Sequence, residues 1–383
     1  MLQLPYAVDV TFEGPVLVIF HGATGNGVAE RMVARARIAA AASTSLSALA
    51  AGFEAVIVAT DSPNEFPTLP GPVLFDVDRT DTPFEMEGRI REVVARYGLQ
   101  KPAVMGSGAL PLLGVADFQM VVEQLEQRDG RFVTNNFFSS DLTAWTPGEA
   151  IERVGTFTRD NVLPRRLRDD AGLLPVVLPR TTATQFDLDT PSDLCILALR
   201  EELEPGLRSL LGEWTLPLGP YRALMPLICD RTAEVVVAGR IGSYAWQHLE
   251  RETACRVRVF SEERGLAAAG PEYRVRSGLG FLYEELGPRR FFERLGELGD
   301  AIVLDLRVLV AHLGLDPSRE DRFQADLYDA AAIEDRALAA IVEAAASAPK
   351  PVVPGGHTLV AGGLMALNDI AWAENDRRLG KTV

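Results

Sequence analysis

Short and almost wholly apolar runs recur along this chain, and helical stretches separate them. The runs at residues 15–22 (PVLVIFHG), 53–61 (FEAVIVATD) and 101–108 (KPAVMGSG) have the length of strands. They lack the alternation of polar and apolar residues that a half-exposed sheet requires. Strands that are apolar on both faces are typical of parallel sheets, because crossover helices cover both sides of such sheets. The pattern predicts an α/β fold with a mixed, mostly parallel sheet and helices on both faces.

The alternation begins again after residue 199. Strands are predicted within residues 234–239, 254–262, 300–312 and 350–363, and helices within 244–252, 280–298 and 333–346. A chain of 383 residues is long enough for two hydrophobic cores. We therefore place a boundary in the connection at residues 200–215, which gives domains of residues 1–203 and 204–383. The second is expected to be a smaller, Rossmann-like α/β domain.

The charge of the chain limits its partners. A formal net charge of −15 argues against nucleic acid or an anionic membrane as the main partner. No apolar run approaches the roughly 20 residues that cross a bilayer, and residues 1–15 lack the pattern of a signal peptide. The three cysteines show no metal-binding spacing and are expected to be buried thiols. These features predict a cytoplasmic protein, and a homo-oligomer is compatible with them.

A glycine-rich turn follows the first predicted strand. In HGATGNGVAERM (residues 21–32), Gly22, Gly25 and Gly27 allow positive φ and a close approach of a ligand, and a helix then begins. The amides of a helix N-terminus attract phosphate, and Arg31 could reach the same group. The spacing matches neither the dinucleotide fingerprint nor the Walker loop. The alternatives are a phosphate-binding turn and a purely structural one.

A polar segment follows a later predicted strand. TNNFFSSDLTAW (residues 134–145) gathers Asn135, Asn136, Ser140 and Asp141 beyond the strand's carboxyl end. These groups could bind a ribose, a sugar or a phosphate, and Asp141 could ligate a metal ion. The structural alternative is a polar loop whose side chains cap neighbouring backbone.

The segment TQFDLDTPSDL (residues 184–194) carries three aspartates. An extended strand would place Asp187 and Asp189 on one face, where both could act as catalytic groups and metal ligands. Thr190 is a suitable N-cap for a helix that starts at the following proline, with Asp193 favouring its first turn. The alternative to a metal site is an acidic strand end.

Two features of the second domain are candidates for binding or catalysis. Gly239, Gly242 and Ser243 lie between a predicted strand and a helix, as in a nucleotide-binding turn, and Ser243 is a natural N-cap. His357 lies in PGGHTLVAGG and is a candidate general acid or base, because its ordinary pKa is near neutrality. A structural turn and a hydrogen-bonded structural histidine are the respective alternatives.

Three of these segments together resemble a known superfamily. GATGNGVAERM, GSGALPLLGVADF (residues 106–118) and FDLDTPSDL are similar to motifs of the nucleotidyltransferase branch of the nucleotide-diphospho-sugar transferases. The nearest likeness is to molybdenum-cofactor and phospholactate guanylyltransferases. The resemblance implies a GT-A-like fold for the first domain and transfer of a nucleotidyl group from a nucleoside triphosphate (NTP) to a phosphorylated acceptor. It also implies Mg²⁺, with Asp187 and Asp189 beside the nucleotide.

The chain departs from that superfamily at two positions. The family motif Gly-Asp-x-Pro-Leu binds Mg²⁺ through its aspartate, but Ala109 stands at that position and cannot ligate a hard cation. The usual Pro-Lys after the glycine turn is also absent. Three hypotheses follow. The chain is a nucleotidyltransferase-like protein with a degenerate metal site, a non-catalytic nucleotide- or phosphosugar-binding protein, or an enzyme of another class with its site in the second domain or at the domain junction.

Overall fold

The computed structural model describes residues 12–22, 25–79, 84–157, 160–262 and 275–381. The chain forms two compact units. The first unit comprises Met1–Thr24 and Ala34–Gln185, and the second comprises Gly25–Val33 and Phe186–Val383. The separately folding domains expected at residues 1–203 and 204–383 stay a prediction.

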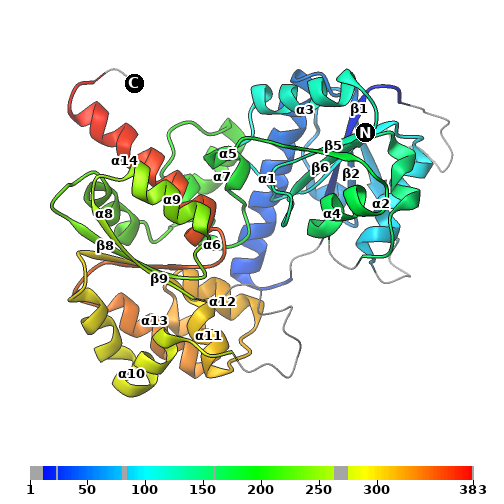
Figure 1. Cartoon of the computed structure of the whole chain (residues 1–383). Coiled ribbons are helices and arrows are strands. Elements are labelled where there is room, and N and C mark those ends of the chain that lie inside the picture. Colours follow the sequence, from blue (N-terminus) through cyan, green and yellow to red (C-terminus); the bar gives the residue numbers. More distant parts are fainter. Residues whose placement is uncertain (1–11, 23–24, 80–83, 158–159, 263–274, 382–383) are drawn as a thin grey trace. The chain divides into compact units, whose positions relative to one another are not determined.

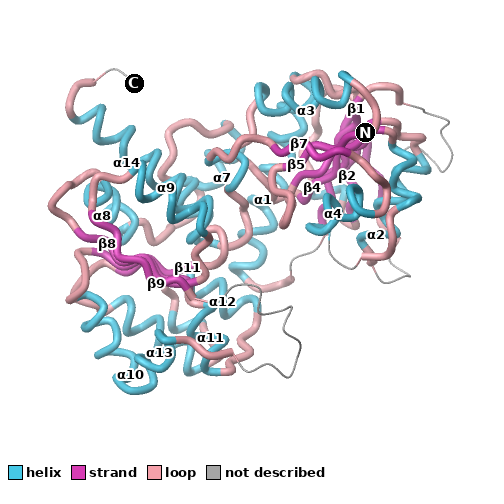
Figure 2. The backbone as a smooth tube through the Cα atoms, in the orientation of Figure 1, coloured by secondary structure: helices cyan, strands magenta, loops and turns pink. Residues whose placement is uncertain are grey.

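The first unit is built on a seven-stranded sheet of order β3-β2-β1-β4-β6-β5-β7 (Figures 1 and 2). Every pairing is parallel except those of β6, which runs antiparallel to β4 and β5. The strands are β1 Pro15–His21, β2 Ala55–Thr60, β3 Val73–Val77, β4 Lys101–Gly106, β5 Arg131–Thr134, β6 Leu142–Thr146 and β7 Leu174–Val177.

Helices cover both faces of this sheet, because alternate side chains of each buried strand enter different cores. Leu17 and Ile19 of β1 pack in a core with α1 and α3, while Val16 and Val18 pack in a second core with α2 and α4. The helices are α1 Val28–Ala50, α2 Met86–Arg96, α3 Val115–Gln127, α4 Leu163–Asp169 and α5 Thr182–Gln185, with short 3₁₀ turns η1 Pro63–Glu65, η2 Gly148–Arg153 and η3 Asp160–Val162.

The second unit contains a four-stranded parallel sheet of order β11-β10-β8-β9. The strands are β8 Glu234–Gly239, β9 Arg256–Ser261, β10 Ala301–Asp305 and β11 Val352–Gly355. One face packs on α10, α11 and α13 in a single core. Figure 1 shows α8, α9 and α14 on the opposite face. The helical segments of the second unit are α6 Pro191–Ala198, α7 Pro205–Gly212, α8 Gly219–Ile228, α9 Ser243–Glu252, α10 Gly278–Gly296, α11 Arg307–Leu313, α12 Arg319–Asp326, η5 Ala330–Ala332, α13 Arg336–Ala346, η6 Leu359–Gly363 and α14 Leu364–Arg378.

The predicted fold class is confirmed. The chain has a mixed, mostly parallel Rossmann-like sheet with helices on both faces and a second, smaller parallel α/β sheet. None of the helices in the ranges described above combines the length and apolar character that crossing a membrane would need.

Four local expectations were wrong. Asp187 and Asp189 lie in irregular chain and not on a strand. The strand predicted over 300–312 ends at Asp305, and His312 lies on helix α11. The strand predicted over 350–363 ends at Gly355, and a π-helical turn follows. The N-cap of α9 is Gly242, so Ser243 is the first residue of that helix.

Candidate functional site

The first sheet has a topological switch point between β1 and β4. From β1 the chain proceeds outward through β2 and β3, and it then returns to pair β4 with the other side of β1. In open α/β sheets, ligands bind outside the carboxyl ends of the strands at such a point. His21 ends β1 and is followed by Gly22, and Ser107 directly follows β4.

A buried hydrogen bond joins the two strand ends at this point. Nδ1 of His21 lies 2.9 Å from Oγ of Ser107, and the backbone amide of Ser107 donates to the carbonyl of Phe20 at 2.9 Å. Burial lowers the pKa of His21, nearby Arg37 lowers it further, and Asp61 opposes them. His21 is therefore a neutral imidazole at physiological pH. Neither His21 nor Ser107 was a candidate site residue on the basis of the sequence.

The turn after β4 carries a sparsely populated backbone conformation. Leu110 has a φ of 46° although it is not glycine, and its side chain is fully buried. Such conformations persist where the surrounding structure enforces them, and they concentrate at binding sites. Ala109 precedes Leu110 in this turn. At the position where the resembled motif has an aspartate, the turn therefore offers backbone groups and a small methyl side chain.

Asn135 organises the polar segment after β5. Its Oδ1 accepts hydrogen bonds from the amides of Asp141 and Leu142, at 3.0 and 3.1 Å. Its Nδ2 donates to Oδ2 of Asp141 at 2.9 Å and to the carbonyl of Thr184 at 3.1 Å. Asn135 is 1% exposed. Its amide is thus fully engaged in holding the loop, as the structural interpretation of this segment expected.

Ser140 also has internal partners. Its hydroxyl lies 2.7 Å from that of Thr134 and 2.8 Å from that of Thr143, and it donates to the carbonyl of Leu142 at 2.7 Å. Asn135, Ser140 and Asp141 are brought together at the carboxyl edge of the first sheet. Of these, Asn135 and Ser140 mainly hold the loop in shape through their internal hydrogen bonds.

An exposed aromatic ring stands on the same loop. Phe138 is 74% exposed, and its amide donates to Oδ1 of Asn136 at 3.1 Å. Its ring meets Phe137 edge to face, and the guanidinium of Arg168 lies 4.6 Å from the centre of the Phe137 ring. Phe138 therefore presents an exposed apolar ring that Phe137 supports. The sequence does not mark this residue as a candidate, because only the fold shows that its ring is exposed.

The glycine turn does begin a helix, but carboxylates occupy its amides. Gly25 has a φ of +118°, as a glycine in that turn permits. The amide of Gly27 donates to Oε2 of Glu30 at 2.9 Å. The amides of Ala29 and Glu30 donate to the carboxylate of Glu320, each at 3.0 Å. Arg31 donates to the carbonyl of Asn26. Two residues of the quoted turn, 23 and 24, lie outside the described residues.

The predicted metal ligands are divided between the units. Asp141 belongs to the first unit, and Asp187 and Asp189 belong to the second. Asp193 acts as predicted at the start of α6: its Oδ2 accepts from the amides of Asp189 and Thr190, both at 2.8 Å. Within the described ranges, no group of three or more His, Cys, Asp or Glu side chains is arranged to hold a metal ion.

The turn after β8 is built around a buried acid. Gly239 has a φ of +139°, and a side chain there would meet Asp305, with its Cβ 2.3 Å from that of Asp305. Asp305 accepts from the amide of Arg240 at 3.2 Å and forms an ion pair with Arg307 at 2.6 Å. Gly242 caps α9 through its backbone position. This turn is therefore closed by the protein's own carboxylate.

His357 lies exposed in the turn between β11 and η6. Elsewhere in the second unit, Glu262 accepts hydrogen bonds from the hydroxyl of Ser277 at 2.8 Å and from the amide of Leu279 at 3.0 Å. It thereby stabilises the first turn of α10.

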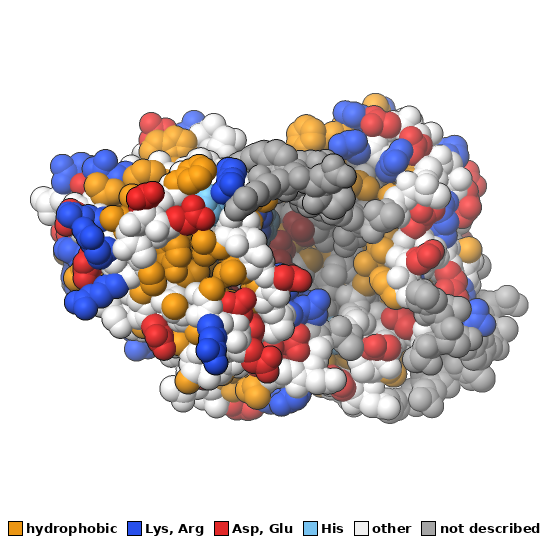
Figure 3. Space-filling model, turned by 90° about the horizontal axis from the view of Figure 1, so that it is seen from below, with side chains coloured by type: hydrophobic (Ala, Val, Ile, Leu, Met, Phe, Trp, Pro, Cys, Tyr) orange, Lys and Arg blue, Asp and Glu red, His pale blue; other side chains and the backbone are white. Residues whose placement is uncertain are grey.

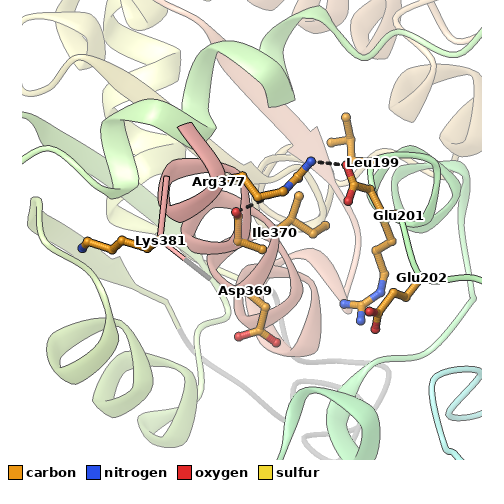
Figure 4. Close-up of a pocket in the computed structure, with 9 residues that line it drawn as sticks. Leu199, Glu201, Glu202, Asp369, Ile370, Arg377 and Lys381 are labelled. Carbon is orange, nitrogen blue, oxygen red and sulfur yellow. Dashed lines mark hydrogen bonds and ion pairs between the residues drawn. The ribbon is translucent and has the colours of Figure 1, made fainter. Parts of the chain in front are cut away.

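A separate cavity of about 550 Å³ lies beside α14 in the second unit (Figure 4). Its charged lining residues are Arg200, Glu201, Glu202, Asp369, Arg377 and Lys381. Three of these side chains are basic and three are acidic, and Arg377 forms an ion pair with Glu201. In Figure 3, acidic and basic side chains are likewise interspersed over the second unit. This balance provides no excess positive charge for a phosphate.

Comparisons with known proteins match the chain to solved structures only. No family model matches the chain, and no curated protein does. A solved structure from Desulfovibrio desulfuricans G20, described as a nucleotide-diphospho-sugar transferase, matches with a TM-score of 0.40 and 16% identity over 52% of this chain and 94% of that one. A CMP:2-keto-3-deoxy-manno-octonic acid synthetase in complex with CTP matches with a TM-score of 0.29 and 12% identity over 43% and 91%. At these TM-scores, neither likeness carries an argument about function.

Proposed function

We propose that this chain is a nucleotidyltransferase-like protein that binds an NTP at the carboxyl edge of the first sheet and handles a phosphorylated acceptor. The observation that carries the proposal is the His21–Ser107 pair at the β1/β4 switch point. Beside it, a Cβ added at Gly22 would meet no atom within 4 Å. A neutral imidazole, a hydroxyl and an uncrowded glycine backbone suit a ligand rich in hydrogen-bonding groups.

In the proposed reaction, an oxygen of the acceptor's phosphate forms a bond to the α-phosphorus of the NTP. The bond from that phosphorus to the bridging oxygen of the β-phosphate breaks, and pyrophosphate leaves. The amides of the turn with Gly22, Gly25 and Gly27 would cradle the phosphates, and Arg31 would offset their charge. Asn136 would offer polar contacts, and the supported ring of Phe138 would pack against an apolar part of a ligand.

The proposal includes a Mg²⁺ ion that only a few protein side chains would hold. This ion is commonly held by one or two carboxylates together with the substrate's phosphates, so a large protein cage is not required. In the first unit, Asp141 is the proposed carboxylate. Asn135 holds its Oδ2 and its backbone amide through hydrogen bonds. Asp187 and Asp189 remain proposed ligands and catalytic groups. When bound, Mg²⁺ would neutralise charge on the phosphates.

The second candidate is a nucleotide- or phosphosugar-binding protein without catalysis. Ala109 favours it, because an alanine stands where the resembled family has its metal-binding aspartate. The two candidates differ in metal dependence and in turnover. Thermal shifts with NTPs, with and without Mg²⁺, together with pyrophosphate release in the presence of phosphorylated acceptors, separate them. Binding without any pyrophosphate release would favour the binder.

Replacement of Ser107 tests the site directly. Ser107→Ala removes the hydroxyl that meets Nδ1 of His21, and we expect NTP affinity to fall by about five- to tenfold, in line with the loss of one hydrogen bond near 1 kcal/mol. Isothermal titration calorimetry measures the change. Ser347→Ala, on an exposed position of the second unit, is the control and should leave affinity unchanged. Unaltered binding by Ser107→Ala, or sensitivity only to His357→Ala, would move the site away from the first sheet.

A further inference from the structure

The first turn of α1 is bound by an acidic side chain that is remote in sequence. Both carboxylate oxygens of Glu320, on α12, accept hydrogen bonds: Oε1 from the amide of Ala29 and Oε2 from that of Glu30, each at 3.0 Å. These residues and Glu320 belong to the same compact unit. A carboxylate with two oxygens on successive helix amides is an anion that uses the same donors as a phosphate bound at a helix N-terminus.

Gly27 allows this close approach. A Cβ added at Gly27 would lie 2.0 Å from Oε2 of Glu320. The amide of Gly27 itself donates to Glu30 at 2.9 Å. The first turn of a helix leaves several amides without intrahelical partners, and here two carboxylates take up the amides of Gly27, Ala29 and Glu30. The glycine that sequence analysis assigned to phosphate thus accommodates Glu320 in this structure.

Glu320 is held from its own helix as well. Nε2 of Gln324, one turn further along α12, donates to Oε1 of Glu320 at 2.6 Å. Burial acts to raise the pKa of Glu320, but the hydrogen bonds from Ala29, Glu30 and Gln324 outweigh it and leave that pKa below its ordinary value. The carboxylate is therefore charged at neutral pH, which is the state that competes with a phosphate.

We propose that Glu320 is an internal anion seated on the phosphate-binding turn of α1, and that the phosphates of a bound nucleotide must displace it. The proposal rests on the proposed function, because it names the regulation of the same turn. In the closed state, Glu320 satisfies the helix amides and lowers the apparent affinity for phosphate. In the open state, the amides of Ala29 and Glu30 turn to the ligand, and the carboxylate returns to solvent.

Two substitutions weaken this contact by different routes. Glu320→Gln keeps the size of the side chain but removes its charge, and it turns an NH₂ group toward helix amides that need an acceptor. Gln324→Met removes the hydrogen bond that holds Glu320 while leaving its charge in place. Glu343→Gln, an exposed acid of the same unit, is the control for the loss of one negative charge.

Isothermal titration with pyrophosphate and with an NTP measures the effect. We expect Glu320→Gln to bind both about two- to thirtyfold more tightly than the wild type, the range for one charge at a helix terminus. Gln324→Met should show a smaller gain, and Glu343→Gln should match the wild type. Circular dichroism confirms that each variant is folded.

The outcomes separate the two proposals. If the wild type binds both ligands, and Glu320→Gln and Gln324→Met bind them equally well or more weakly, the proposed role of Glu320 is overturned. Glu320 would then be a helix cap, and the proposed function would stand. A gain in Glu343→Gln equal to that in Glu320→Gln would also overturn it, since general charge would then explain the effect. Absence of NTP and pyrophosphate binding in the wild type and in every variant would overturn the proposed function itself.

Discussion

Asp326 is a buried acid that receives little compensation from opposite charge. It lies on α12 with 5% of its surface exposed, and its Oδ2 accepts from the amide of Ser192 at 3.3 Å. The pKa of Asp326 is raised from 3.8 to about 6: burial is the largest cause, hydrogen bonds from Thr190 and Ser192 oppose it, and the charge of Asp305 adds to it. The folded protein therefore holds this proton more tightly than the unfolded chain does.

Asp326 gives stability a predictable pH dependence. Its contribution is fully present below pH 3.8, falls as pH rises toward about 6, and is constant above that. The rise in the pKa of Asp326 from 3.8 to about 6 corresponds to about 3 kcal/mol. Asp326→Asn should remove this fall, so the difference in unfolding free energy between variant and wild type should grow in favour of the variant from pH 4 to pH 7. Urea denaturation across that range measures it. A constant difference would show that Asp326 titrates normally.

Single residues were the hardest to find from sequence. Gly25 and Gly27 were selected correctly as members of a helix-starting turn, because glycine before a helix is a strong local signal. Glu320 was not, since a helical acid almost 300 positions away has no local signature. His21 was passed over because one histidine ending an apolar run resembles a structural residue. Only the β1/β4 pairing brings it to Ser107.

Among the elements, η2 shows how closely backbone can pack. Gly148 begins this turn, and its amide donates to the carbonyl of Gln100 at 2.7 Å. A Cβ at Gly148 would lie 1.8 Å from the carbonyl oxygen of Leu99. The obstacle is backbone beside β4 and not a flexible side chain, so the contact cannot be relieved by a rotamer change.

Gly148→Ala should therefore destabilise the protein by about 3 kcal/mol or more, as expected for overpacking against backbone. Gly88→Ala is the matched control: Gly88 lies within α2 of the same unit, and a Cβ there meets nothing within 4 Å. That change should stabilise by about 0.5–1 kcal/mol, because alanine loses less backbone entropy in a helix. Chemical denaturation of both variants measures the two effects. A mild effect of Gly148→Ala would mean that η2 can shift.

Elements were predictable where their apolar pattern was long and unbroken. The strands β1, β2, β4 and β8 and the helix α13 all fall within the predicted ranges. Strand β6 was missed because its five residues, LTAWT, stand between a polar loop and Pro147. The run after β10 was taken as one long strand because an apolar helix and an apolar strand look alike over a few residues.

At the scale of the whole molecule, the two units are not separated by one cut in the chain. The second unit includes Gly25–Val33, which lies between two segments of the first. It also includes α6, whose Leu194, Ile196 and Leu197 are fully buried. Any single boundary drawn from composition, such as residue 203, assigns α6 to the first domain.

Fragments of the chain test how the second unit depends on α6. A fragment of residues 186–383 retains this helix, whereas one of residues 204–383 loses three fully buried aliphatic side chains and exposes what they covered. We expect the shorter fragment to be less soluble and to show a weaker thermal transition by circular dichroism, since losses of this kind cost several kcal/mol. Equal behaviour of the two fragments would support the predicted boundary at 203/204.

The amide of Asn135 has a consequence for how this edge of the sheet can diversify. One side chain fixes the path of the loop through four hydrogen bonds. Asn136 and Phe138, on the same loop, take no part in these four hydrogen bonds, and the Asn136 side chain accepts only from the amide of Phe138 among the bonds described above. At the proposed site, substitutions of Asn136 and Phe138 can therefore change ligand preference while the hydrogen bonds of Asn135 keep the loop in place.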